Sequence, residues 1–173
     1  MSQVYLVRTN QKVNFARIQL DMLEDAHDEN GWDKHAKIEA LHESILFLMA
    51  SALDAYYKEI AEKYRFNPAA VKAFDDLEQM VEASVQESPE VQEIRQLLSI
   101  EGSWLNRLMS AYQACWRAAD GVVEPKSMSV SEIHVVQINP DHKQDKDLLI
   151  ELKGWLNEIR RLLEAQRSSF QEW

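Results

Sequence analysis

ILFLMASAL, residues 45–53, is the stretch of sequence that decides the fold. It is apolar on almost every side, so we expect the helix that contains it to be the one around which its neighbours pack. A 3.6-residue apolar repeat extends this helix in both directions and predicts a span of about 33–64. The uncharged run, residues 44–53, is about half as long as a bilayer span requires, which indicates a core helix rather than a membrane helix.

Four further segments carry the same helical repeat on either side of this centre. They are residues 3–27, 67–86, 88–119 and 145–170. The chain contains only four Gly and four Pro, too few for a fold rich in hairpins, and most of them fall between these segments. We therefore predict an all-α, up-and-down bundle of four to five antiparallel helices in a single domain, 1–173. The segment 88–119 keeps nearly one helical phase, so it is either one continuous helix or breaks near Gly102 and restarts from Ser103; we favour the break.

Residues 120–144 differ from the rest of the chain. They contain Gly121, Pro125 and Pro140 around the stretch VSEIHVVQI, residues 130–138. That stretch has strand propensity, but the chain offers no second strand to pair with it. We interpret residues 120–144 as an extended arm that lies over the bundle before the last helix.

Charge and cysteine content exclude several classes of protein. The formal net charge is −10, so the chain lacks the basic footprint that nucleic acids and anionic membranes require. A single cysteine, Cys115, excludes an internal disulfide framework. The N-terminal sequence has no basic and apolar signal segment, so we expect a cytoplasmic location with no membrane or nucleic-acid partner.

Histidine and glutamate spacing suggests one candidate metal site. Glu24 and His27, like Glu39 and His42, are three residues apart, the spacing that places both ligands on one helix face in di-iron bundles. The two pairs are offset along the predicted hairpin by roughly 10 Å, which argues against a di-iron centre. A smaller site for one divalent ion would use His35, Glu39 and His42 with help from His27. The alternative is a solvated helix edge without a metal, so no cofactor is predicted unless a divalent metal binds here.

A basic seam runs along the last predicted helix. Lys146, Lys153, Arg160 and Arg167 follow one another at intervals of seven residues. They could bind an anionic ligand or an acidic partner. The alternative is that they pair with acidic residues of the bundle or are simply solvated.

Gly154 interrupts the same helix away from its apolar stripe and costs about 1 kcal/mol of helix stability relative to alanine. We consider a close contact at Gly154 and Trp155, made by the arm or by a second chain, with a chance glycine as the alternative.

Nucleophilic chemistry finds no support in the sequence. No Gly-x-Ser-x-Gly motif and no phosphate-binding glycine loop is present, and four glycines could not supply them. Cys115 lies in the apolar phase of its helix with no base nearby in the sequence, which is typical of a small core residue. We therefore predict no catalytic residue.

Three stretches of the chain resemble the recurring blocks of an uncharacterised bacterial family known only as a domain of unknown function. They are VRTNQKVNFARI (residues 7–18), SWLNRLMSAYQACW (residues 103–116) and QRSSFQEW (residues 166–173). The resemblance implies a bacterial, single-domain, cytoplasmic protein and assigns no role to any residue. We expect a non-catalytic helical module that acts through protein contacts, either with a protein partner or as a homodimer; the alternative is a small bundle that binds a metal or an anion.

Overall fold

The structure of the chain, a computed structural model, describes residues 3–116 and 143–169. In these two ranges the chain forms six α-helices and one 3₁₀ turn, and no strand occurs in them. The predicted all-α class is confirmed, with a helix count slightly above the predicted four to five. Most of the arm predicted at residues 120–144 lies outside the described ranges.

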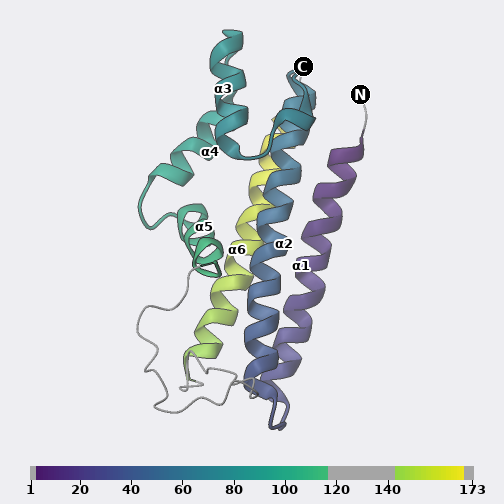
Figure 1. Ribbon diagram of the computed structural model, residues 1–173, viewed down its shortest axis with the longest axis vertical. Coiled ribbons are helices and arrows are strands. Elements are labelled where there is room, and N and C mark those ends of the chain that lie inside the picture. The colour runs from purple at the N-terminus through teal and green to yellow at the C-terminus, as the bar shows by residue number, and fades with distance from the viewer. Residues whose placement is uncertain (1–2, 117–142, 170–173) are drawn as a thin grey trace, which may run out of the picture.

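Three long helices lie side by side and form the body of the fold (Figure 1). They are α1 (Val4–Asp28), α2 (Lys34–Lys63) and α6 (Lys143–Ser169). The short connection between α1 and α2 makes these two helices antiparallel, as predicted. The helix α6 begins at the same end of the bundle as α2 and runs in the same direction.

Three short helices cover the side of α2 and α6 that is opposite α1 (Figure 1). They are α3 (Phe74–Ser84), α4 (Pro89–Ser99) and α5 (Trp104–Ala114). The helix α1 packs on α2 and α6, so it stands at one edge of the molecule with a long face directed away from the core.

Serine caps set the boundaries of α4 and α5. The Ser88 side chain accepts a hydrogen bond from the Val91 amide at 3.3 Å, and Pro89 occupies the first helical position. The Ser103 side chain accepts from the Asn106 amide at 3.1 Å. Between these helices Gly102 has φ of 82°, a left-handed conformation that glycine adopts at little cost. The predicted break near Gly102 is confirmed.

The helix predicted from residue 67 begins later. Asn67 does accept a hydrogen bond from the Ala69 amide at 3.1 Å, but only the 3₁₀ turn Pro68–Ala70 follows. The Asp76 carboxylate accepts from the amides of Lys72 and Ala73 at 2.8 and 3.0 Å, and α3 starts at Phe74. Asp76 therefore sets the beginning of this helix, because it satisfies amides that would otherwise lack partners.

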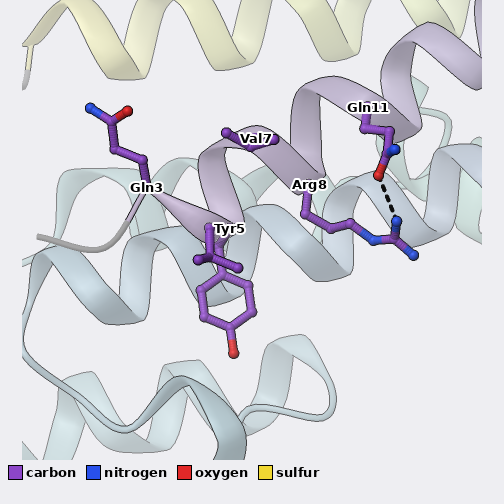
Figure 2. A pocket seen from close by; sticks show the side chains of 6 residues that line it. Gln3, Tyr5, Val7, Arg8 and Gln11 are labelled. Carbon is purple, nitrogen blue, oxygen red and sulfur yellow. Dashed lines mark hydrogen bonds between the residues drawn. The ribbon is translucent and has the colours of Figure 1, made fainter.

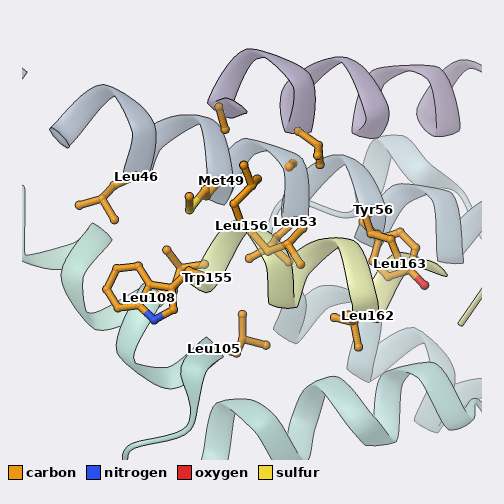
Figure 3. Packing of buried hydrophobic residues seen from close by; sticks show 14 of the residues in the cluster. Leu46, Met49, Leu53, Tyr56, Leu105, Leu108, Trp155, Leu156, Leu162 and Leu163 are labelled. Carbon is orange, nitrogen blue, oxygen red and sulfur yellow. The ribbon is translucent and has the colours of Figure 1, made fainter. Parts of the chain in front are cut away.

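The core lies around the centre of α2, as its apolar sequence predicts. Ile45, Leu46, Met49 and Leu53 are each no more than 1% exposed. Figure 3 shows Leu46, Met49 and Leu53 of α2 meeting leucines of α5 and α6, together with Trp155. No helix in the described ranges is long and apolar enough to cross a membrane.

Candidate interaction surface

A line of large apolar side chains runs along the side of α1 that faces away from the core. Their exposed fractions are 64% for Val4, 59% for Val7, 39% for Phe15, 41% for Ile18 and 47% for Met22. Together with exposed Gln11, these residues recur every three or four positions and occupy one face of the helix. We call these six residues the outer stripe: Val4, Val7, Gln11, Phe15, Ile18 and Met22.

The outer stripe is separate from the buried stripe by which α1 joins the fold. The buried residues of α1 are Thr9, Val13, Ala16, Leu20, Leu23 and Ala26. At about 100° per residue, the centres of the two stripes lie roughly 150° apart around the helix. The helix is therefore apolar on two nearly opposite faces, and packing on α2 and α6 covers one of them.

A shallow hollow of about 670 Å³ lies at the N-terminal end of the outer stripe. It is lined by Gln3, Tyr5 and Arg8 and by the first three stripe residues, Val4, Val7 and Gln11. Figure 2 shows the Arg8 side chain extending along the helix, where its guanidinium donates to the Gln11 side chain at 2.6 Å. This end of the stripe thus combines apolar surface with a guanidinium group.

The residues of the predicted metal site lie near the α1–α2 connection. The His35 ring and the Glu39 carboxylate form a contact of 3.0 Å, and His35 is buried. The Lys34 ammonium donates to the His27 carbonyl at 2.5 Å. Across the described ranges, no group of three or more His, Cys, Asp or Glu side chains is arranged to hold a metal ion. Metal binding by His27, His35, Glu39 and His42 stays a prediction from the sequence.

The described side chains of the predicted basic seam differ in their surroundings. The Lys153 ammonium contacts the Glu24 carboxylate of α1 at 2.8 Å. The Arg167 guanidinium donates two hydrogen bonds to the Glu59 carboxylate of α2, at 2.8 and 2.7 Å. Arg160 is half-buried, and the side chain of Lys146 lies outside the described part. Two of the four cations therefore pair with acidic residues of α1 and α2, Lys153 at the surface and Arg167 in a largely buried position. Anion binding along the seam stays a prediction.

Gly154 lies on a groove of about 530 Å³ between α5 and α6. Within the described residues, a Cβ added at Gly154 would meet no heavy atom within 4 Å outside its own helix backbone and neighbours. Trp155 lines the same groove but is 6% exposed and packs in the core (Figure 3). The predicted contact at Gly154 and Trp155 thus falls on a groove with room at the glycine.

A partly buried polar cluster links α1, α2, α4 and α6, and sequence reasoning did not predict it. The Tyr56 hydroxyl donates to the Gln166 side chain at 2.5 Å, and the Gln166 amide donates to Glu93 at 2.8 Å. Arg167 also donates to the Asn10 side chain at 2.8 Å. The partners of Gln166 and Arg167 are more than 70 positions away in the sequence, so no local spacing could have indicated these contacts.

Glu90 belongs to the same end of the molecule and is 2% exposed. Its carboxylate accepts hydrogen bonds from Lys63 at 2.7 Å, Tyr64 at 2.6 Å and Ser88 at 2.9 Å. Burial opposes ionisation of Glu90, but the hydrogen bonds, first among them that from Lys63, hold the pKa of this carboxyl below its usual value. Because these groups satisfy one another, the cluster has the character of a structural network.

Cys115 is partly buried beside the core, and its thiol donates to the Ala111 carbonyl at 3.4 Å. Burial raises the pKa of this thiol, which keeps it protonated at neutral pH. The sequence interpretation of Cys115 as a packing residue agrees with this environment.

Comparison with known proteins gives one match. The sequence model of a family described as "Family of unknown function (DUF6586)" matches residues 1–173. A search of curated proteins and a search of solved structures each found no match to the chain.

Proposed function

The chain belongs to this family of unknown function, and we propose that it is a non-catalytic helical module that acts through protein–protein contacts on the outer stripe of α1. The observation that carries the proposal is the alignment of five large exposed apolar side chains on one face of α1, with Gln11 among them. Single exposed apolar residues are common on protein surfaces, whereas a line of this length along one helix face is typical of an interaction site.

The energetics favour the same function. Burial of apolar surface contributes about 25 cal/mol per Å², so a line of five partly exposed apolar side chains offers several kcal/mol to a partner that covers it. Keeping these side chains in water brings no corresponding gain to the folded chain, because the opposite face of α1 already supplies its packing. The stripe also lies on a regular helix, which presents its side chains in a fixed arrangement and reduces the entropy lost on binding.

The test compares the complete chain with two single variants in capture experiments from an extract of the native host. Ile18→Glu places a charge in the middle of the stripe, and Asn157→Glu introduces the same charge change at an exposed position of α6. We expect at least one protein to bind the wild type and Asn157→Glu at equal levels and to be lost from Ile18→Glu. Equal recovery of every protein on all three baits would overturn the proposal, provided that thermal melting shows all three to be folded.

A further inference from the structure

We propose that the outer stripe pairs, in antiparallel orientation, with the outer stripe of a second copy of the chain. This inference rests on the proposed function, because it assigns a partner to the same surface. It draws on three properties of α1: the position of the helix in the fold, the symmetry of its stripe and the distribution of its charges.

The position of α1 leaves its outer face accessible to another helix over most of its length. Among the residues that the structure describes, the helix packs on α2 and α6 through one face and stands at the edge of the fold (Figure 1). From Val4 to Met22 the stripe is about 27 Å long at 1.5 Å per residue. A straight apolar line on an accessible helix is suited to a second straight helix, packed side by side at about 8–10 Å.

The spacing of the stripe is compatible with a twofold axis near residue 13. Such an axis places Val7 opposite Ile18 of the second copy, and Val4 opposite Met22 of the second copy. At both ends of the paired stripes a valine then meets the larger Ile18 or Met22 of the other copy. Phe15 lies close to the axis. In a parallel pair each residue would meet its own copy, which would place valines together at one end and methionines together at the other.

The charges of α1 are divided along its length in a way that favours the antiparallel pair. From its start to Arg17, the helix carries three cations and no carboxylate: Arg8, Lys12 and Arg17. The rest of the helix carries four carboxylates and no Lys or Arg: Asp21, Glu24, Asp25 and Asp28. Three of these groups already have a partner within the chain, because Arg17 pairs with Asp21 and Glu24 contacts Lys153 of α6. Antiparallel pairing places the cationic part of one copy along the acidic part of the other, whereas parallel pairing would oppose like charges. The helix dipoles favour the same orientation.

The size of the stripe predicts a weak dimer. One pair of helices in contact over about 27 Å buries an area at the low end of specific interfaces, which is typical of transient complexes. We therefore expect a dissociation constant on the order of 10 µM.

The first test is sedimentation velocity of the complete chain over about a hundredfold range of concentration around that value. We expect a reversible change from monomer to dimer. Ile18→Glu should weaken the dimer by about a hundredfold, because each dimer contains the substitution twice. Asn157→Glu should dimerise like the wild type, which separates a local effect of the charge from a change in net charge. A wild-type chain that stays monomeric throughout the range would overturn the proposal.

The second test reports orientation. In a Cys115→Ser background, the Val7→Cys protein is mixed with the Ile18→Cys protein and oxidised gently. Antiparallel pairing predicts a mixed disulfide, because like positions would lie about 15–18 Å apart, far beyond the reach of a disulfide. Disulfides formed only between identical chains would overturn the antiparallel arrangement.

The two experiments also separate this inference from the proposed function. If the wild type is monomeric but Ile18→Glu loses a captured protein, the stripe binds a different partner and self-pairing is wrong. If the wild type dimerises and Ile18→Glu changes neither dimerisation nor capture, the stripe is not the interaction surface and both proposals are wrong.

Discussion

Gly154 and Gly102 both have space for a larger side chain, but only the backbone conformation of Gly102 favours glycine. Within the described residues, an added Cβ would meet no atom within 4 Å at either position, beyond the immediate neighbours and own-helix backbone. Gly154 lies inside α6, where alanine is favoured by about 1 kcal/mol, whereas Gly102 has φ of 82° and would strain any side chain by about 1–2 kcal/mol. We expect urea denaturation to show that Gly154→Ala stabilises the chain and Gly102→Ala destabilises it. A loss of stability in Gly154→Ala would support the close contact predicted from the sequence.

Val85 is a strained residue at the C-terminal end of α3. Its φ is 58° and its ψ is 17°, a left-handed conformation that a β-branched residue seldom adopts, and its side chain is 94% exposed. Glycine would relieve about 1–2 kcal/mol of strain. Part of this gain would be offset, because glycine loses more backbone entropy on folding than valine does. We expect Val85→Gly to stabilise the chain by about 0.5–1 kcal/mol in chemical denaturation. A lower melting temperature would instead mean that the Val85 side chain makes contacts beyond the described residues.

The C-terminal part of α6 is attached to α2 by the ion pair of Arg167 and Glu59. Both hydrogen bonds are shorter than 3 Å, and the side chains are 22% and 10% exposed. Removal of the guanidinium leaves a nearly buried carboxylate without its cation, so Arg167→Met should cost about 2–3 kcal/mol of unfolding free energy. The double variant Glu59→Gln with Arg167→Met should recover part of the loss in a double-mutant cycle. Additive effects of the two substitutions would show that the pair is not coupled.

Helix identity was predictable where the local sequence contains the signals that begin or end a helix. Ser88 with Pro89, and Gly102 with Ser103, placed two boundaries correctly because their caps involve residues only a few positions apart. The start of α3 was predicted too early, because Asn67 and Asp76 both satisfy backbone amides and the sequence does not show that only a 3₁₀ turn follows Asn67.

The candidate site was less predictable than the helices, since it depends on which face of α1 the rest of the fold covers. From the sequence alone, Phe15, Ile18 and Met22 fit a widened core face as well as a separate outer face, and the structure places them on the outer face. Both faces of α1 show a helical repeat, and tertiary packing decides which one is buried. The two partners of Arg167 are likewise set by the arrangement of α1 and α2 against α6.

At the scale of the whole molecule, the cluster around Glu90 makes stability depend on pH at both extremes. The pKa of Glu90 lies below 4.5 in the folded chain, so the cluster stabilises the fold at neutral pH. That contribution is lost as the pH falls from 4.5 through the lower folded pKa. Burial and the hydrogen bond to Glu90 raise the pKa of Tyr64 to about 12, so its contribution is lost as the pH rises from 10 towards 12.

Glu90→Gln tests the loss of stability at acid pH, because it removes the ionisable carboxylate and keeps a side chain of nearly the same shape. The variant should be less stable than the wild type at pH 7, since Lys63 loses its carboxylate partner in a largely buried position. The difference between the two proteins should shrink as the pH falls below 4.5, where the wild-type carboxylate becomes protonated. Denaturation midpoints measured from acid to alkaline pH will show whether the curves converge in this way. Parallel curves through the acid range would mean that Glu90 does not contribute to the pH dependence, and that other carboxylates set the acid limit of the fold.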